Sequence, residues 1–399
     1  MTDADVTKVS DLSDEAVSRF FVSIVCGIYL VGYAGYSFGD ALGPLRYLVY
    51  VVPLLLVASL LSQRAPMTNR HAIAFLIAYL VLAFVSDLVG AKGGDSYLRN
   101  VVIISLIIVA FVPVIHVSAA QINLIFVCSV IYLSLAYWLA GVGNIRILQI
   151  LRAGTGSAFQ AGFDDNQGGL LGPLYAVFMY AMGTKLQFVI ALLMSLLGGK
   201  RVGVAAILLG VVVAIAFRNV AALQQRRRRA VALFAVLAAT NLLALNMNSI
   251  SEYVQQSFGI SVNIEEVMLG RYAIGSELNY AMATRPLSES LFGAGPGSAD
   301  TVASRVTDGI LTQPHNDWMK VLYDYGIVGS LTITIFMAAI FSTSATAAAL
   351  IVATAALMCT DNVVIYLFYQ IPLALMVAYA APREMSTQKI ALRGVTLSP

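Results

Sequence analysis

Three polar side chains, His315, Asn316 and Asp317, stand together directly before a long apolar stretch at residues 318–341. Such a triplet adds nothing to apolar burial, and polar or ionisable groups at a membrane domain are typical of functional sites. An imidazole ordinarily titrates at about pH 6.5, which suits it to accept a proton from a hydroxyl group near neutral pH. His315 is therefore the candidate general base.

A structural interpretation covers two of these three residues. Asn316 or Asp317 can cap the helix that follows, because short polar side chains bond the free amides of a first turn. Capping does not account for His315, which is the only one of the three histidines predicted to lie at the outer face. His71 and His116 fall at segment ends predicted to face the cytoplasm. Asn316 and Asp317 are also candidates for substrate binding.

Basic residues mark the places where an anionic group could be held. Lys200 and Arg201 stand where a predicted span meets the outer face, and Arg271 lies among apolar neighbours in a long hydrophilic loop. Snorkelling to lipid headgroups is the alternative for the first pair. Because basic residues are disfavoured in outer loops, we expect an anionic partner, which the guanidinium fork matches well. Arg201 and Arg271 are candidate catalytic residues, and Lys200 is a candidate substrate-binding residue.

Several other polar residues have both a structural and a functional interpretation. Arg285 and Arg305 lie in the same loop, where a solvated surface position is favoured, although Arg285 is also a candidate for substrate binding. The polar segments 162–168 and 361–362 are typical of turns and helix caps. Within the first of them, Asn166 is a further candidate for substrate binding.

Composition indicates a polytopic helical membrane protein. Hydrophobic residues make up 59% of the 399 residues and charged residues 11%, against about 25% charged residues in soluble domains. The net charge of +3 is small and no basic domain stands apart, so nucleic acid is not an expected partner. The three cysteines lie inside apolar runs, which argues against a disulfide framework. The chain lacks metal-ligand spacing and a glycine-rich nucleotide loop, so no cofactor or metal is expected.

Spans of about 20 apolar residues can be placed along the whole chain. The run Arg226–Arg229 is the strongest topological anchor, because basic residues in short loops stay cytoplasmic, and it predicts that both termini are cytoplasmic. The short spans on either side of Lys185 can also be read as one broken element. The twelve predicted spans lie at residues 20–38, 41–61, 71–89, 98–116, 121–141, 168–184, 186–199, 202–217, 230–246, 318–341, 344–360 and 363–380.

The segment 247–317 is the largest predicted extramembrane region. Apolar residues recur with helical spacing at 251–256 and 264–284, and a turn cluster follows at 293–297, so we expect a small helical cap over the outer end of the bundle. The expected organisation is a cytoplasmic tail at 1–19, spans one to nine in 20–246, the periplasmic loop 247–317, spans ten to twelve in 318–380, and a cytoplasmic tail at 381–399.

Three stretches, in this order, resemble the O-antigen ligase and polysaccharide polymerase superfamily of bacterial inner membranes. They are the segment Leu197–Gly203, then Gly270-Arg271 with residues 285–287 and 292–297, and finally Pro314–Asp317 followed by Gly326–Gly329. A weaker similarity lies at 162–166, and the resemblance covers roughly residues 150–380. The chain departs from the family pattern at Lys200, where a serine is common, and at Asp165, where a proline often precedes the asparagine.

The resemblance implies a membrane glycosyltransferase with a GT-C-like helical fold. Its donor would be a glycan on undecaprenyl pyrophosphate at the periplasmic face, and the reaction would be inverting and independent of metals. Lys200, Arg201 and Arg271 could stabilise the leaving pyrophosphate, and His315 could activate the acceptor hydroxyl. Expected partners are the lipid-linked donor, a glycan acceptor and membrane lipids, and other polysaccharide export or assembly proteins are candidates.

The acceptor distinguishes two reactions within this family. A polymerase joins repeat units of an exopolysaccharide or O-antigen, whereas a ligase transfers the chain to lipid A–core, a heavily phosphorylated acceptor that favours a basic surface. The segment 247–317 carries three arginines and eight acidic residues, so a polymerase is preferred. A lipid-linked oligosaccharide flippase or another transporter is the alternative of a different class. It would be expected to show internal repeats and interrupted helices, and neither is evident in the sequence.

Overall fold

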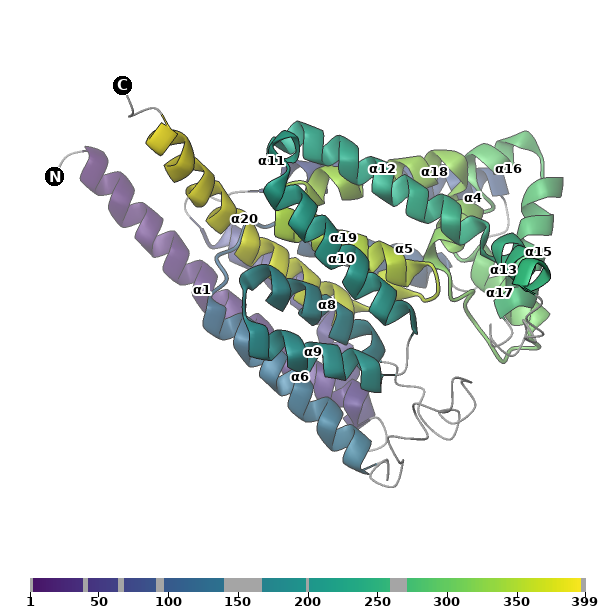
Figure 1. Ribbon diagram of the computed structural model, residues 1–399, viewed down its shortest axis with the longest axis horizontal. Coiled ribbons are helices and arrows are strands. Elements are labelled where there is room, and N and C mark those ends of the chain that lie inside the picture. The colour runs from purple at the N-terminus through teal and green to yellow at the C-terminus, as the bar shows by residue number, and fades with distance from the viewer. Residues whose placement is uncertain are drawn as a thin grey trace.

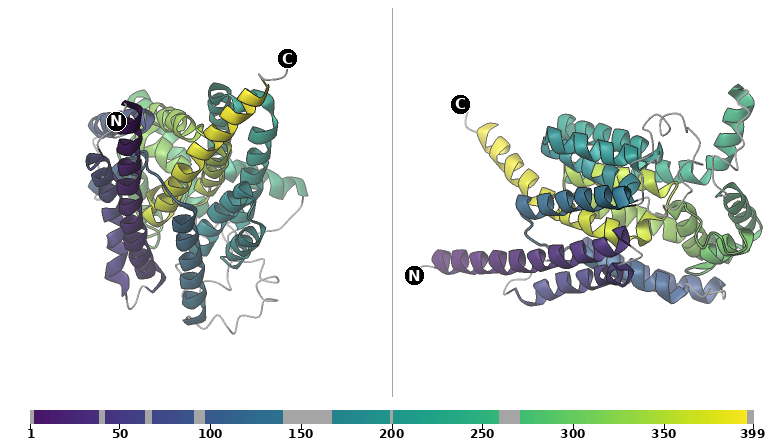
Figure 2. Two further views of the ribbon diagram at one scale, coloured as in Figure 1. Left: turned by 90° about the vertical axis from the view of Figure 1, so that its left-hand side faces the viewer. Right: turned by 90° about the horizontal axis from the view of Figure 1, so that it is seen from below.

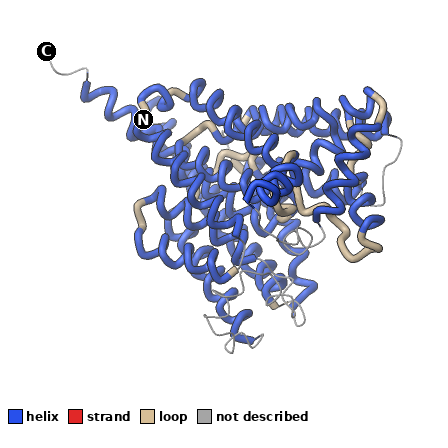
Figure 3. Tube along the Cα trace, turned by 45° about the vertical axis from the view of Figure 1, so that its right-hand side comes forward, coloured by secondary structure: helices blue, strands red, loops and turns tan. Residues whose placement is uncertain are grey.

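The computed structural model describes residues 3–38, 42–63, 68–90, 97–139, 167–198, 201–258 and 271–395. Within these ranges the chain is helical almost throughout and contains no β-strand (Figure 3). In chain order the elements are α1 (Asp3–Ser37), η1 (Gly43–Val51), α3 (Val52–Leu61), α4 (Arg70–Gly90), α5 (Tyr97–Ala110), α6 (Ala119–Leu139), α8 (Gln167–Met182), α9 (Lys185–Leu197), α10 (Arg201–Asn219), α11 (Ala221–Gln224), α12 (Arg226–Leu245), α13 (Met247–Phe258), α15 (Arg271–Thr284), α16 (Leu287–Phe292), α17 (Ser298–Val306), α18 (Asp317–Phe341), α19 (Ala345–Met358), η4 (Val363–Ile365) and α20 (Leu367–Val395).

Every segment predicted as a span contains an apolar helix, and six of these helices are long and apolar enough to cross a membrane. The six lie at Asp14–Ser37, Gly43–Leu61, Arg70–Gly90, Val202–Asn219, Arg226–Leu245 and Asp317–Phe341. The other six apolar helices have 10–17 residues each among the described residues. The protein is therefore an α-helical membrane protein by composition and helix length, and the count of twelve spans stays a prediction.

The bundle has two distinct ends (Figures 1 and 2). At one end α1 begins, α20 ends, and α11 is joined by Gln225 to α12, which begins at Arg226. At the other end α13, α15, α16 and α17 cover the bundle; we call this the capped end. The arrangement agrees with the predicted sidedness, in which the termini and the arginine run share one side and the 247–317 segment lies on the other.

Both predicted tails are largely helical. α1 begins at Asp3 and continues into the first apolar segment without interruption, and α20 continues past its apolar part to Val395. Once a helix is nucleated by an apolar span, each added residue gains a backbone hydrogen bond, so the helix extends into polar sequence. The boundaries expected at residues 19 and 381 therefore do not coincide with helix ends.

Helix α19 lies at the centre of the bundle, and all of its residues are buried. Ser344 caps it by accepting a hydrogen bond from the amide of Ala347 at 2.9 Å, and the alanine-rich run that follows has high helix propensity and lets neighbours approach closely. α10 packs along α19. Because Arg218 Nη2 lies 3.3 Å from Thr346 Oγ1, the last turn of α10 meets the first turn of α19.

The short helices α8 and α9 form a hairpin around Lys185. Gly183, with a φ of 76°, begins the turn between them. At the other end the backbones touch, because a Cβ added to Gly198 would lie 2.1 Å from the amide nitrogen of Gly169. The two predicted spans are thus one antiparallel hairpin of two helices. The hairpin places residue 167 and residue 198 at the same end, next to the start of α10.

The segment predicted as a helical cap is helical over most of its described length. α15 and α17 enclose a small apolar core of their own, made of Ile274, Leu278, Ala299, Val302, Ala303 and Met319. The turn cluster is also confirmed, because Gly293, Gly295 and Gly297 all have positive φ angles. Met319 belongs to α18, so this core joins the cap directly to the bundle.

Candidate functional site

His315 lies at the capped end beside Asp361. Its Nδ1 is 3.8 Å from Asp361 Oδ1, with 24% of the His315 side chain and 4% of the Asp361 side chain exposed. This separation is longer than a hydrogen bond but within reach of an ion pair. The backbone of His315 has a φ of 51°, which is uncommon for a residue other than glycine. A carboxylate beside an imidazole orients the ring and stabilises its protonated form, as a general base requires.

The two residues after His315 hold it in place from both sides. Asn316 Oδ1 accepts a hydrogen bond from the amide of Met319 at 3.0 Å, so the predicted cap of α18 is confirmed for Asn316. The same side chain donates through Nδ2 to the carbonyl oxygen of Ala244, at the end of α12, at 3.2 Å. Asp317 is fully buried, and its Oδ2 accepts from the amide of Val364 in η4 at 2.8 Å.

Arg201 is the first residue of α10, and its side chain lies outside the described residues. The position of its backbone follows from the packing of α10 on α19. Since Arg218, at the end of α10, meets Thr346, at the beginning of α19, the two helices run in opposite directions. The first turn of α10 therefore lies toward the C-terminal end of α19, which leads into Asp361.

Arg271 is the first residue of α15, and its side chain is also outside the described residues. The next residue, Tyr272, accepts a hydrogen bond through its carbonyl oxygen from Asn248 Nδ2 at 3.3 Å. Asn248 belongs to α13, which directly follows the end of α12 contacted by Asn316. The backbones of Arg201 and Arg271 and the side chain of His315 are thus all at the capped end. Lys200 and Asn166 lie outside the described residues.

Arg285 is not the solvated surface group that the sequence favoured. Its Nη1 donates to the carbonyl oxygen of Tyr323 at 3.1 Å and its Nη2 to that of Leu322 at 3.3 Å. The guanidinium also stacks over the Tyr323 ring, 5.6 Å from the centroid. Burial lowers the pKa of Arg285 from its usual value, yet arginine stays cationic. By contrast Arg305 is exposed and pairs with Glu277 at 3.1 Å, as expected for a surface group.

The carbonyls bound by Arg285 belong to a break in α18 that the sequence analysis did not anticipate. Gly326 has φ 68° and ψ −169°, so Asp317–Tyr325 and Ile327–Phe341 are two helices in succession. A Cβ at residue 326 would lie 2.4 Å from the carbonyl carbon of Leu291, so only glycine fits against α16.

The carbonyls of Leu322, Tyr323 and Asp324, just before the break, accept hydrogen bonds from protein donors. The amide of Ala294 donates to Tyr323 O at 3.0 Å, and that of Gly295 to Asp324 O at 3.1 Å. Ser86 Oγ on α4 also donates to the Asp324 carbonyl. A helix end inside a membrane protein needs such partners. The 293–297 turn therefore supplies amide donors to carbonyls that the break leaves without helical partners.

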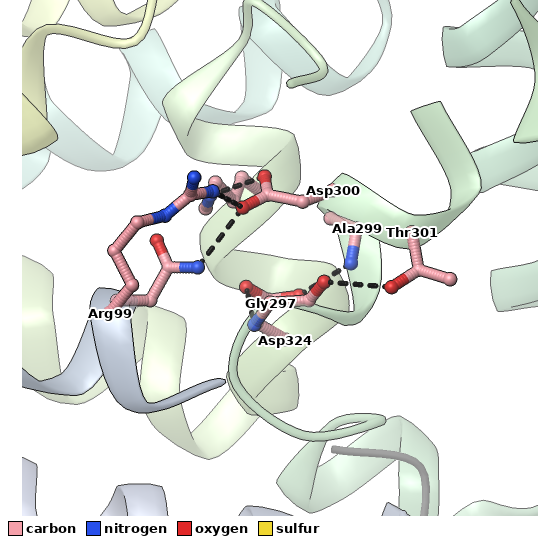
Figure 4. A network of polar contacts seen from close by, with 8 residues as sticks. Arg99, Gly297, Ala299, Asp300, Thr301 and Asp324 are labelled. Atoms are coloured by element: carbon pink, nitrogen blue, oxygen red, sulfur yellow. Dashed lines mark hydrogen bonds and ion pairs between the residues drawn. The ribbon is translucent and has the colours of Figure 1, made fainter. Parts of the chain in front are cut away.

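A buried network of charges connects the cap to α18 and α5 (Figure 4). Lys320 Nζ lies 2.5 Å from Asp300 Oδ1 on α17, and both side chains are 5% exposed. Asp300 Oδ2 also accepts from Asn100 Nδ2 at 3.0 Å and from Arg99 Nη2 at 3.4 Å. Figure 4 shows the Arg99 side chain directed toward the Asp300 carboxylate. The Asp300 carboxylate thus accepts hydrogen bonds from side chains of two bundle helices, α18 and α5.

Asp324 performs a related task at the beginning of α17. Its Oδ2 accepts from the amide of Gly297 at 2.9 Å and its Oδ1 from the amide of Ala299 at 2.8 Å. A carboxylate at this position caps the helix and complements its dipole. Asp317, Lys320 and Asp324 are spaced i, i+3 and i+7, so they share one face of the helix. That spacing is the sign in the sequence from which this buried polar face could have been predicted.

No group of three or more histidine, cysteine or acidic side chains that could hold a metal ion occurs within the described ranges. Among the described side chains, the capped end holds an imidazole, several carboxylates and the guanidinium of Arg285. No protein-family model matches this chain, and neither a curated protein nor a solved structure is significantly similar to it.

Proposed function

We propose that this chain is a membrane glycosyltransferase with a GT-C-like, twelve-span fold that polymerises glycan repeat units carried on undecaprenyl pyrophosphate. The observation that supports it most is the His315–Asp361 pair at the capped end, where the backbones of Arg201 and Arg271 also lie. This end offers a base and two cations outside the apolar bundle. The resemblance to the O-antigen ligase and polysaccharide polymerase superfamily agrees with it. The site would face the periplasm of a bacterial inner membrane.

The proposed reaction is a single displacement with inversion. The acceptor hydroxyl oxygen attacks the anomeric carbon of the donor, and the bond from that carbon to the pyrophosphate oxygen breaks. His315 takes the hydroxyl proton, and Asp361 orients the imidazole and stabilises the imidazolium. Arg201 and Arg271 stabilise the charge that develops on the departing undecaprenyl pyrophosphate. Lys200 and Asn166 remain proposed substrate contacts, whereas Arg285 would act by holding the end of the first half of α18, since it donates to the Tyr323 and Leu322 carbonyls. Asn316 and Asp317 would act mainly by holding His315, since both already bond to the protein.

Turnover by the purified protein is the direct test. The full chain in detergent is mixed with a defined oligosaccharide on undecaprenyl pyrophosphate, and the products are separated by size. Longer glycans on the lipid carrier are expected, with release of undecaprenyl pyrophosphate and inversion at the anomeric carbon. An intact donor after prolonged incubation, with protein that still binds it, would reject an enzymatic role.

A deletion strain separates polymerase from ligase. We prefer the polymerase because the described part of the cap exposes few cations: Arg285 is bound to carbonyls and Arg305 is paired with Glu277. Loss of long chains, with single repeat units still attached or secreted, is expected. Polymer accumulating on the polyprenyl carrier, together with lipopolysaccharide that lacks its glycan, would identify a ligase.

A lipid-linked oligosaccharide flippase is the second candidate, and the break in α18 at Gly326 favours it. Transporters commonly use interrupted helices whose free ends face the substrate. Here, however, the carbonyls of Leu322, Tyr323 and Asp324 already bond to Arg285, Ala294 and Gly295, which leaves them unavailable to a substrate. Reconstitution in vesicles decides between the two classes. Movement of the lipid-linked donor across the bilayer without glycan elongation would establish transport.

A further inference from the structure

The four consecutive arginines Arg226–Arg229 do not have one common role. Arg229 is buried, and its guanidinium donates to the carbonyl oxygens of Leu223 at 3.2 Å and Gln224 at 3.0 Å. It therefore fixes the junction between α11 and α12. Arg226, Arg227 and Arg228 are exposed, and no acidic side chain within the described part of the chain forms an ion pair with them.

Two of the exposed arginines share an open recess with apolar side chains. Arg227, Arg228, Val231 and Ala232 line a volume of about 340 Å³ on one face of α12. The i, i+3 and i+4 spacing places the apolar pair one turn further along the helix than the guanidinium groups. Val231 is 70% exposed, and Leu242, further along α12, is 62% exposed. Cations at the head of this face are therefore followed by an uncovered apolar surface.

The local electrostatics call for an anion. Adjacent guanidinium groups repel one another, and the first turn of a helix disfavours cations. The first turn of α12 contains no acidic residue to offset them. The arginine fork matches phosphate oxygens in two-point geometry, while Val231 and Ala232 match hydrocarbon. A molecule that joins a phosphate to an acyl chain satisfies both halves of the recess.

We propose that Arg227, Arg228, Val231 and Ala232 bind an anionic phospholipid, with its phosphate on the arginines and its acyl chain along α12. The site lies at the end of the bundle opposite the cap, on the side predicted to be cytoplasmic. It is independent of the proposed glycosyltransferase activity. Basic clusters at a membrane surface attract anionic lipids, and here an exposed apolar side chain follows the arginines on the same face of the helix.

The test compares lipids added to the purified full chain in a neutral detergent. The measured quantity is the midpoint of thermal unfolding, because a ligand that binds only the folded state raises it. Phosphatidylglycerol is expected to raise the midpoint. Phosphatidylcholine at the same mole fraction, and the soluble headgroup glycerol 3-phosphate, are not. In the R227Q/R228Q variant the apparent affinity for phosphatidylglycerol should fall by roughly tenfold or more, the scale expected for two cations at an anionic surface.

Arg226→Gln is the matched control, because it removes one exposed arginine that does not line the recess, and it should keep most of the effect. The Val231→Asp variant tests the same site by placing a carboxylate beside the arginines at an exposed position, and it should also lose the response. An undiminished response to phosphatidylglycerol in both R227Q/R228Q and Val231→Asp would overturn the proposal. So would equal stabilisation by phosphatidylcholine or glycerol 3-phosphate, an equal loss in Arg226→Gln, or stabilisation by a DNA oligonucleotide but not by lipid.

Discussion

Nδ1 of His315 faces Oδ1 of Asp361 at 3.8 Å, although one residue precedes α18 and the other follows α19. The pair forms only when these two helices pack with their ends level at the capped end. Asn316 holds the His315 backbone in place by its hydrogen bond to α12, and Asp317 keeps Asp361 nearby by its hydrogen bond to η4. The proton transfer proposed for this pair would therefore depend on correct packing of these helices.

Replacing His315 should lower turnover more than replacing Asp361. His315→Ala removes the proposed base and should nearly abolish glycan elongation while donor binding persists. Asp361→Asn keeps a side chain of similar shape, removes the charge that orients the imidazole, and should reduce turnover less severely, by roughly 10²-fold or more. Rates and donor affinity are measured on the purified variants. In the H315A/D361N variant the losses should not add, because the two residues act as one unit.

The pH dependence follows from the direction of protonation. A base must be neutral to accept a proton, and Asp361 favours the protonated imidazole, so turnover should fall as the pH drops, beginning above the ordinary histidine value of about 6.5. The wild-type rate constant is measured from pH 5 to 8 at saturating donor, a window of about three units around that value. A rate that is flat across this window, with a fully active His315→Ala variant, would remove His315 from the mechanism.

Arg201→Ala and Arg271→Ala should weaken binding of the donor pyrophosphate. A hydrogen bond to a charged group contributes about 1.5–3 kcal/mol, so each change should reduce donor affinity by roughly 10- to 150-fold. Direct binding of the lipid-linked donor is the measurement. Arg305→Ala is the control, because Arg305 is exposed and paired with Glu277, and it should behave as wild type. Unchanged binding in both variants contradicts the assignment.

Breaking the buried Lys320–Asp300 ion pair should destabilise the protein strongly. Lys320→Met leaves the Asp300 carboxylate buried with only Asn100 and the more distant Arg99 as partners. Loss of one partner of a buried pair typically costs about 3–5 kcal/mol. A lower midpoint of thermal unfolding in detergent is the expected result.

The exposed Arg305–Glu277 pair offers the matched comparison for this ion pair. Glu277→Gln should cost at most about 1 kcal/mol, because exposed ion pairs contribute little. Similar midpoints for Lys320→Met and Glu277→Gln would mean that the buried pair contributes no more than a surface one. Removing both buried charges, in K320M/D300L, should recover part of the lost stability, since no isolated carboxylate then remains.

Gly326→Ala should prevent α18 from docking on α16. The added Cβ would clash with the Leu291 backbone at 2.4 Å, and the φ of 68° is itself strained for alanine. Gly309→Ala is the control, because Gly309 has a similar φ of 82° but open space around it. It should cost only the roughly 1–2 kcal/mol of a left-handed alanine. Yield and monodispersity of the purified variants report the difference, and equal behaviour of the two would argue against the close contact.

Topology can be tested by labelling single cysteines in a variant that lacks the three native ones. Ile310 in the cap is 83% exposed, and Gln224 lies exposed at the opposite end. A membrane-impermeant reagent applied from the periplasmic side should label Ile310→Cys and spare Gln224→Cys, because basic loops stay cytoplasmic. The reverse pattern would invert the orientation.

The sequence predicted the local features of this protein better than its tertiary contacts. Apolar periodicity located the helices, and the polar residue before α18 predicted the Asn316 cap. Both depend on neighbouring residues alone. The role of Arg285 depends on carbonyls freed by a break elsewhere in the chain, so charge and position within the loop suggested solvent exposure instead.

The interrupted α18 was missed for a related reason. A glycine within an apolar run is common in membrane helices, and what fixes the break at Gly326 is the backbone of Leu291 pressed against it. Asp361 was read as a turn residue, and its carboxylate indeed accepts from the next amide, of Asn362, at 2.9 Å. Its nearness to His315 arises only from the packing of α18 on α19.

The break in α18 also bears on how the chain enters the membrane during synthesis. Only Ile327–Phe341 is free of charged residues, because the preceding part carries Asp317, Lys320 and Asp324. At 1.5 Å per residue this apolar part extends over roughly 22 Å, less than a hydrocarbon core of about 30 Å. We therefore expect a translocon to retain this segment poorly by itself. Its integration would wait for the earlier helices α4 and α12, against which it packs, which makes assembly of the capped end a late event in biogenesis.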